Sequence, residues 1–325
     1  MTVWETGKQP VVTLVAKRVA SMLLTILLLS LLTFLLPYLS PGDPGVLILR
    51  ARMGGTLPAS REAVEVLKEE MGLNLPPHII YGRWLSGALR GDLGHSYVTR
   101  QPAAQTLREA LIATAQLGLF AGVLIVAIGL PLGTTCARRP NAPLDRLSSV
   151  LASVSVSIPA YVASLVAILL FAVTWRLLPA AGRGTLSHLV LPGLSVAVPG
   201  IAAAFRLTRY NMMEEMGREH VAVARSKGLA EGTVRRRHIL RNAAPPLVTY
   251  FGLQMGWLLS GTVIVESIFG WPGMGRLLVD SVLSFDIPVV QGSVLLIGTL
   301  FVGINFATDL LCLHLDPTLR PEGMI

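Results

Sequence analysis

Long runs without a charged residue recur along the chain, and the segments between them hold most of the Lys, Arg, Asp and Glu. Six of these uncharged windows are rich in apolar residues: 19–42, 110–137, 147–175, 189–205, 242–265 and 287–308. A helix needs about 20 mainly apolar residues to cross roughly 30 Å of hydrocarbon. The windows approach or exceed that length, so the pattern predicts an all-α integral membrane protein with six transmembrane helices.

The first and fourth windows could be read in other ways. Basic residues precede window 19–42, as in a secretory signal, but its uncharged run is longer than a signal core of roughly 7–15 residues and no clear cleavage site follows. We therefore expect an uncleaved span. Window 189–205 is short and contains Pro192 and Pro199, yet membrane helices tolerate proline when neighbouring groups satisfy the freed backbone atoms. We expect a kinked helix there.

Composition supports a membrane protein and argues against a nucleic-acid-binding one. Hydrophobic residues make up 52% of the 325 residues and charged residues 14%, against roughly 25% charged in a soluble domain. The net charge is +8, but the basic residues lie between apolar windows and form no continuous basic domain. We therefore expect membrane lipid, and no nucleic acid, around this chain. Cys136 and Cys312 lie at window ends without metal-ligand spacing.

The charge of the short segments predicts the orientation, because Lys and Arg favour the cytoplasmic side. Segments 138–146 and 206–241 and the N-terminal flank are basic, so we expect both termini and both segments in the cytoplasm. Segment 43–109 then lies outside. Within it Ser60 can cap a helix that ends near Gly72, with Ala63, Val66, Leu67 and Met71 on one face. The predicted division is 1–42 (N-terminus and first span), 43–109 (extracytoplasmic segment) and 110–325 (five-helix core).

Candidate chemistry is sparse. The sequence has no phosphate-binding loop, no paired-histidine zinc motif, no nucleophile elbow and no metal-ligand cluster, so we expect no catalytic residue, no metal site and no cofactor in this chain. The polar residues Asn305 and Asp309 lie one helical turn apart within or next to the last window. They form a candidate intramembrane polar pair, either as an interhelical or loop contact or as an ion site.

The most informative segment is the cytoplasmic stretch 214–246. Ala222, Val223, Ala224 and Leu229 give it a surface of small and apolar residues next to basic ones, and Gly228 interrupts the helical pattern before a second short helix over about 233–242. Two short helices with such a surface would fit a groove of a cytoplasmic protein. A solvated loop or one that binds lipid headgroups is the alternative.

This stretch resembles the cytoplasmic coupling loop of ABC importer permeases, in the branch that transports dipeptides, oligopeptides, glutathione and nickel or metal chelates. The family pattern places its glycine on Gly228, its third opening position on Ala224 and its late leucine on Leu240, whereas Ala222, Val223, His238 and Arg241 depart from it. Six further segments resemble the same branch in order: PGDP at 41–44, WLSGALRGDLGHS at 84–96, HLVLPGLSVA at 188–197, VESIFGWPGMGRLLVDSV at 265–282, IPVVQG at 287–292 and DPTLR at 316–320.

The resemblance implies a type I ABC importer permease fold with an extracytoplasmic insertion after the first helix, as in the B-type subunit of the family. It implies a second homologous permease, two ATPase subunits that bind ATP and Mg, a solute-binding protein, and a place in a bacterial or archaeal cytoplasmic membrane. The residues that it assigns to ATPase coupling are Glu219, Ala222, Ala224, Arg225, Lys227, Gly228, Leu229, Arg235 and Arg237. Peptide is the expected substrate, with nickel or a metal chelate as the alternative. Two alternatives from other classes are an ion-coupled carrier and an intramembrane enzyme, and no Ser/His or paired-Asp set supports the enzyme.

Overall fold

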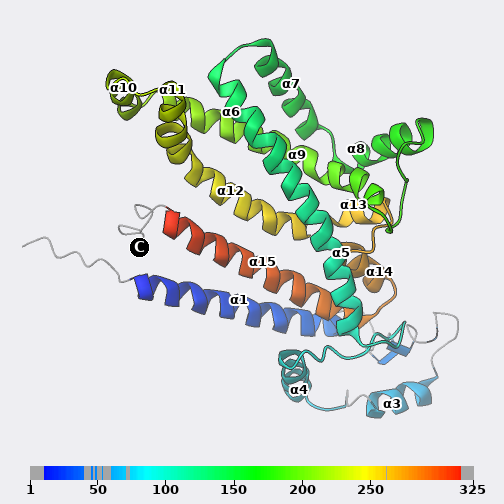
Figure 1. The fold of residues 1–325 in the computed structure, drawn as a ribbon. Helices are drawn as coiled ribbons and strands as arrows, with labels where there is room; N and C mark the ends of the chain where they lie inside the picture. The colour runs from blue at the N-terminus through cyan, green and yellow to red at the C-terminus, as the bar shows by residue number, and fades with distance from the viewer. Residues whose placement is uncertain are drawn as a thin grey trace, which may run out of the picture. The chain divides into compact units, whose positions relative to one another are not determined.

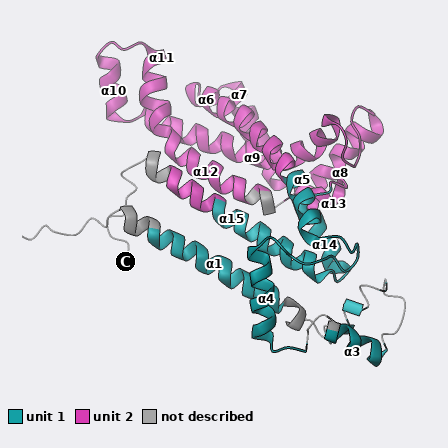
Figure 2. Cartoon of the chain, turned by 60° about the horizontal axis from the view of Figure 1, so that its bottom comes forward, with its two compact units in different colours: residues 1–114, 272–303 teal, residues 115–271, 304–325 magenta. Residues whose placement is uncertain are grey.

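The computed structural model describes residues 11–39, 45–46, 48–49, 53, 60–70, 74–260 and 262–315. Every regular element longer than a single bridge in these residues is a helix (Figure 1). The described chain forms two compact units, one from residues 1–114 and 272–303 and the other from 115–271 and 304–325 (Figure 2). The segments 41–44 and 316–320 and the predicted helix stop at Gly72 lie outside the described residues.

The first unit contains α1 (Val11–Leu39), α3 (Arg61–Glu70), α4 (Pro77–Leu89), the start of α5 (Ala103–Leu124), α14 (Met274–Leu283) and most of α15 (Ile287–Leu315). Its core joins α5 to α14 and α15 through Leu107, Met274 and Val289. The segment before α5 is held by the buried carboxylate of Asp286, which accepts hydrogen bonds from the Ser96 hydroxyl and from the Tyr97 backbone N–H. These contacts fix the start of α5 against the start of α15.

The predicted helix after Ser60 is present as α3. The Ser60 hydroxyl accepts a hydrogen bond from the Ala63 backbone N–H at 3.2 Å, which confirms the expected cap. The predicted apolar face was partly wrong, because Val64 and Leu67 are buried while Val66 is exposed. The buried face of α3 therefore contains Val64 and Leu67 but not Val66. A short helix with apolar residues at neighbouring positions does not show from its sequence alone which face is buried.

The second unit contains the rest of α5, the π-helix η1 (Ile125–Gly129), α6 (Leu130–Arg138), α7 (Pro143–Ser157), α8 (Ala160–Ala167) and η2 (Ile168–Thr174). These are followed by α9 (Leu186–Met216), α10 (Glu219–Ser226), α11 (Glu231–Thr233), η3 (Val234–Leu240), α12 (Arg241–Ser260), α13 (Val263–Ile268) and the end of α15. Helix α9 runs through the middle of this unit and packs against α6, α7, α8 and α12.

Glycines bring α6 close to α9. A Cβ added at Gly133 would lie 2.6 Å from Thr208 Cβ and 2.8 Å from the Phe205 carbonyl oxygen, and one added at Gly129 would lie 2.7 Å from Ala204 Cβ. Gly129 and Gly133 are four residues apart, the small-xxx-small spacing that lets membrane helices approach closely. The contact of η1 and α6 with α9 thus depends on the missing side chains at two positions, Gly129 at the end of η1 and Gly133 in α6.

Four helical segments of the described chain are long and apolar enough to cross a membrane: Ala16–Leu35, Ala103–Arg138, Leu186–Met216 and Ile287–Leu311. A fifth is reached if Pro143–Ser157 and Ala160–Thr174 are counted as one span, although these two bend by 106° from one another. Four of the six predicted windows therefore correspond to such helices, and window 147–175 is broken. The break follows from Pro159, since Ile158 before it is extended with φ −89° and ψ 122°.

Two predicted boundaries need correction. Helix α9 contains Pro192 and Pro199 and continues to Met216, so the first third of the predicted loop 206–241 is helical. The predicted short helix over 233–242 does not end there, because α11, η3 and α12 form one continuous helical stretch from Glu231 to Ser260. Pro245 and Pro246 remove two N–H donors from α12, which leaves carbonyls one turn earlier without their usual α-helical partners, next to the π-helical η3.

Candidate functional site

The predicted cytoplasmic segment folds as a helical hairpin between the end of α9 and the start of α12 (Figure 1). Helix α9 ends at Met216 with Gly217 as its cap, and α10 begins two residues later at Glu219. Helix α10 then packs against η3 on the returning arm. The eight-residue α10 belongs to none of the candidate membrane spans.

Gly228 ends α10 as the sequence predicts. Its φ is +74°, a left-handed conformation that glycine adopts without steric cost. The Gly228 N–H donates to the Arg225 carbonyl at 2.9 Å and the Leu229 N–H donates to the Ala224 carbonyl at 3.4 Å, which is the pattern of a Schellman cap. A Cβ at Gly228 would meet no atom within 4 Å, so only the backbone angle requires glycine here.

One side of α10 is buried within the chain itself. Val221 and Ala224 of α10 pack in a cluster of seven buried apolar residues that joins four other elements. The other five members are Ala137, Met212, Val234, Ile239 and Ala243. Ala224 is only 4% exposed, so the structure separates it from the outward surface on which the sequence analysis placed it. Its small side chain allows α10 to approach η3.

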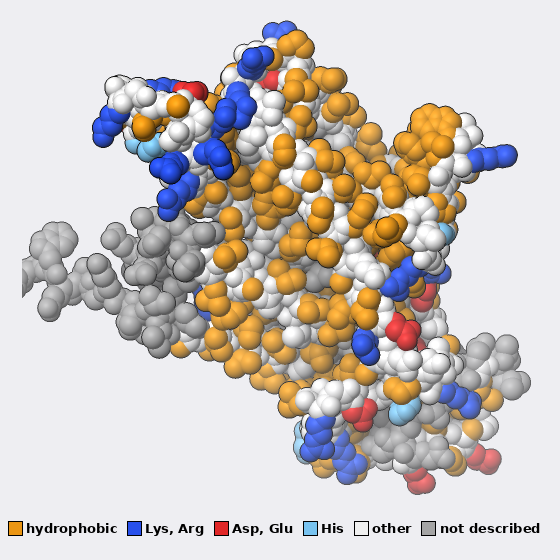
Figure 3. All heavy atoms as spheres, viewed as in Figure 1, with side chains coloured by type: hydrophobic (Ala, Val, Ile, Leu, Met, Phe, Trp, Pro, Cys, Tyr) orange, Lys and Arg blue, Asp and Glu red, His pale blue; other side chains and the backbone are white. Residues whose placement is uncertain are grey.

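The opposite side of α10 is exposed. Ala222 and Val223 of α10 face outward, as does Leu229 just beyond the helix; Val223 is 52% and Leu229 41% exposed. The charged candidate residues Glu219, Lys227 and Arg237 are also exposed, and Arg235 is half-buried. Lys and Arg side chains gather at the end of the second unit that holds α10 and α11 (Figure 3). The hairpin therefore has a small exposed apolar surface with basic side chains around it.

An exposed ion pair links the two arms of the hairpin. Arg225 donates from Nε and Nη2 to the carboxylate of Glu231 at 3.2 and 2.9 Å. The hydrogen bonds from Arg225 lower the pKa of Glu231, and the same carboxylate raises the pKa of Arg225. Both groups stay charged over the physiological pH range, although their exposure limits what the pair contributes to stability.

Asn305 and Asp309 both lie on α15 with the predicted one-turn spacing. Asn305 is half-buried, and its Oδ1 accepts no hydrogen bond from the residues that the structure describes. Asp309 is exposed on the same helix. Their action as a pair stays a prediction.

Several buried charged residues were missed by the sequence analysis. Arg209 donates from Nε and Nη2 to Asp145 at 2.6 and 2.8 Å, and this carboxylate on α7 is 2% exposed. Glu266, fully buried on α13, accepts a hydrogen bond from the Thr262 hydroxyl at 2.8 Å. Asp145 and Arg209 lie in the segments 138–146 and 206–241, which the sequence predicts as cytoplasmic loops, and Glu266 follows directly after the window that ends at 265. The extension of α9 beyond 205 brings Arg209 to Asp145.

Comparison with known proteins identifies the family of this chain. Residues 129–321 match the family described as the binding-protein-dependent transport system inner membrane component, and residues 11–118 match the N-terminal family of such membrane components. The chain belongs to this permease family. The resemblance inferred from the motifs of the sequence is thereby confirmed.

Relatives and solved structures agree with this assignment. The permease is 34% identical to the glutathione transport system permease protein GsiC of Salmonella paratyphi A over 306 residues, 94% of this chain and 98% of that protein. It is 38% identical over 315 residues, with the same two coverages, to a Brucella abortus protein provisionally named a peptide transport system permease. A chain of the inward-facing MetNI methionine ABC transporter shares the fold, with a TM-score of 0.55 at 20% identity over 65% of this chain and 97% of that one.

Family membership decides between the classes of function. The permease is a non-catalytic, multi-pass inner membrane component of a binding-protein-dependent ABC importer. The ion-coupled carrier and the intramembrane enzyme are therefore set aside. The family also implies partners that hydrolyse ATP and deliver the solute.

Proposed function

We propose that the permease forms one half of the pore of an importer for di- or oligopeptides. In this proposal the other half is a second homologous permease, two ATPase subunits bind ATP and Mg, and an extracytoplasmic solute-binding protein delivers the substrate. The names of the relatives support peptide, since glutathione is itself a tripeptide and the Brucella protein is named for peptides. The resemblance to nickel permeases has no specific support among these relatives, so nickel is the second candidate.

The membrane arrangement that we propose has six spans in a bacterial or archaeal cytoplasmic membrane. Helix α12, 20 residues long, would add a span to the four helices and the bent pair described above. Both termini and the 206–241 segment would lie in the cytoplasm, and 43–109 would lie outside. The division into 1–42, 43–109 and 110–325 follows from that arrangement. The chain itself would bind no cofactor.

The coupling part of the proposal rests on the exposed face of α10. Ala222 and Val223 of α10, and Leu229 just beyond it, present apolar side chains to the outside, while Val221 and Ala224 pack the helix against the rest of the unit. A short helix with one anchored and one open apolar face is suited to a groove of another protein. We assign this groove to an ATPase subunit, whose closure would move α10 and, through the cluster behind it, α9 and α12.

A charge on the open face tests the coupling role. We expect Val223→Glu to abolish co-purification of the ATPase subunits and ATP-dependent uptake, because it places a carboxylate in an apolar contact. Val66→Glu is a matched control, since Val66 on α3 is 56% exposed against 52% for Val223. It should retain the ATPases. Wild-type ATPase retention and uptake in Val223→Glu would show that α10 is not the coupling element.

Substrate competition tests the peptide part. The complete transporter, with its binding protein, is reconstituted in proteoliposomes and supplied with labelled tripeptide or with labelled Ni²⁺. We expect ATP-dependent uptake of the tripeptide, inhibited by unlabelled di- and tripeptides. If the transporter instead took up nickel in an ATP-dependent way and peptides did not inhibit that uptake, the substrate would be nickel and not peptide.

A further inference from the structure

A glutamate occupies an electrostatically unfavourable place next to α10. Glu215 lies in the last turn of α9, where the helix dipole presents partial negative charge and disfavours a carboxylate. Its side chain is only 7% exposed, so water cannot compensate for the charge. Such a carboxylate requires partners from the protein.

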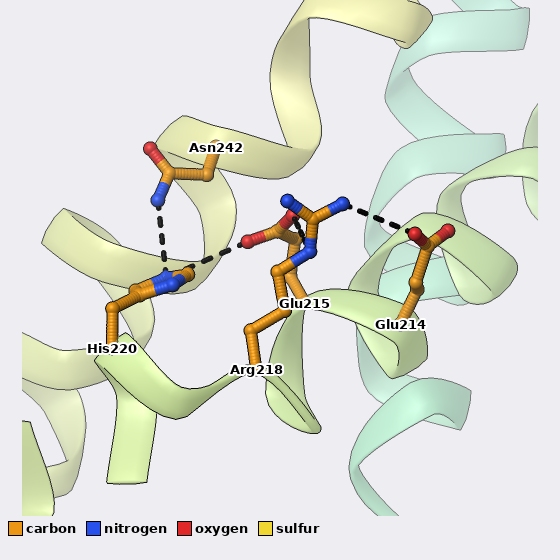
Figure 4. A network of polar contacts seen from close by, with 5 residues as sticks. All are labelled: Glu214, Glu215, Arg218, His220 and Asn242. Carbon is orange, nitrogen blue, oxygen red and sulfur yellow. Dashed lines mark hydrogen bonds and ion pairs between the residues drawn. The ribbon is translucent and has the colours of Figure 1, made fainter. Parts of the chain in front are cut away.

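Those partners come from the segment that begins α10 (Figure 4). Arg218, the N-cap residue of α10, places its Nε 2.9 Å from Glu215 Oε1. His220 in the first turn of α10 places its Nε2 3.5 Å from Glu215 Oε2. That oxygen is buried and accepts no hydrogen bond within the described part of the chain, so His220 is the neighbour that faces it.

The same histidine reaches a third helix. The Asn242 side-chain nitrogen, from the first turn of α12, lies 3.2 Å from the same His220 Nε2 (Figure 4). A ring nitrogen either donates or accepts, so Nε2 can donate toward Glu215 or accept from the Asn242 amide, but not both at once. The polar group is next to the apolar cluster in sequence as well, because Met212, Val221 and Ala243 belong to that cluster and lie within three residues of Glu215, His220 and Asn242 respectively. Glu215 therefore lies where α9, α10 and α12 meet.

We propose that Glu215 is a positioning residue that holds the start of α10 against α9 through Arg218 and His220. A helix of eight residues has too few internal hydrogen bonds to be stable alone, so its position depends on contacts with its neighbours. Glu215 supplies a charged contact to Arg218 and faces His220 at the end where α10 leaves α9, while Val221 and Ala224 supply the apolar contact. This inference rests on the proposed coupling role of α10 for its functional consequence, but not for its structural one.

Glu214 provides a matched control. It precedes Glu215 on the same helix and also pairs with Arg218, with its Oε1 3.1 Å from Arg218 Nη2 (Figure 4). Its side chain is 49% exposed, however, and in the described part of the chain the carboxylate that pairs with His220 is that of Glu215. The two glutamates differ mainly in burial and in the link to His220.

Hydrogen exchange of the 219–226 amides in the purified transporter, in lipid nanodiscs, tests the proposal. We expect Glu215→Ala to accelerate their exchange about tenfold, because local opening becomes easier when the charged contact is lost. Glu214→Ala should stay within about twofold of wild type, as expected for an exposed pair. Glu215→Gln keeps the side-chain volume and serves if the alanine variant assembles poorly; it should accelerate exchange about threefold, because it removes the charge that faces His220.

The outcomes separate this proposal from the coupling role. Wild-type exchange in both Glu215 variants, or equal acceleration in Glu214→Ala, would overturn the positioning role. Uptake per ATP hydrolysed is measured on the same preparations and should fall with the Glu215 variants. Faster exchange with unchanged uptake per ATP would support the positioning role and contradict the assignment of α10 as the coupling helix.

Discussion

Helix α6 packs on α9 through glycines, whereas α10 packs on η3 through a few apolar side chains and has its charged contacts with α9 and α11. At Gly133 a single added carbon would meet Thr208 and the Phe205 backbone below 3 Å, so the two helices have no freedom to approach further. At α10 the buried part is limited to Val221 and Ala224, and the remaining residues from 222 to 230 are exposed. The first contact is suited to a fixed scaffold, and the second to an element that moves or binds a partner.

The largest effect is expected where a charge is buried on the scaffold side. Asp145→Ala leaves the Arg209 guanidinium without its bidentate partner, and breaking such a buried pair costs about 3 kcal/mol or more. Unfolding of the purified permease in denaturant measures this loss. Asp280→Ala is the control, because Asp280 is 62% exposed and lies 3.5 Å from Arg276; it should cost less than about 1 kcal/mol. Equal stability of the two variants would mean that the α7–α9 pair contributes nothing.

The glycine contact itself comes next. Gly133→Ala places a methyl group against backbone and Cβ atoms of α9 that cannot rotate away, and we expect a loss of about 2–3 kcal/mol. Gly118→Ala adds the same methyl group with only Leu258 Cβ at 3.8 Å, an ordinary contact distance. That variant should unfold like wild type. If Gly133→Ala unfolded like Gly118→Ala, the α6–α9 contact would be less rigid than its geometry indicates.

The two regions also differ in how far the sequence predicts them. Four of the six apolar windows are membrane-length helices in the structure. They were predictable because a helix that crosses a bilayer must be mainly apolar over about 20 residues. The bend at Pro159 was not predictable in this way, because Pro192 and Pro199 lie inside an unbroken α9. Whether a proline breaks a helix depends on the groups that surround it in the fold.

In the candidate site, too, some features could be predicted from the sequence and others could not. The stop at Gly228 was predictable, because a glycine that ends a helical pattern is a local signal. The inward direction of Ala224 was not, since a helix with small residues on several sides gives no clear inner face. The contacts of Glu215 with His220 and of His220 with Asn242 depend on how α9, α10 and α12 pack together, so no spacing in the sequence predicts them.

On the α10 side of the comparison, the backbone at Gly228 should be the most sensitive position. Gly228→Val forces a β-branched residue to adopt φ +74° and should cost about 1–3 kcal/mol of local stability. Gly232→Val is a matched control, since neither glycine has an atom within 4 Å of its added Cβ and only Gly228 has a positive φ. We expect reduced uptake and faster exchange of the 219–226 amides for Gly228→Val alone. Similar behaviour of both variants would show that the left-handed turn is not required.

The smallest effect is expected from the exposed pair between Arg225 and Glu231. Because Arg225 lowers the pKa of Glu231, the folded hairpin favours the charged carboxylate, and its contribution is present above the ordinary carboxylate pKa of about 4.3 and is lost as the pH falls through the lower folded pKa. Glu231→Gln should therefore speed exchange of the hairpin amides slightly at neutral pH. That difference from wild type should shrink in acid and in high salt, since an exposed pair is screened. Glu69→Gln, on an exposed glutamate of α3, removes the same charge elsewhere and should leave the hairpin unchanged. A difference between Glu231→Gln and wild type that persisted in acid would indicate that the carboxylate acts by shape and not by charge.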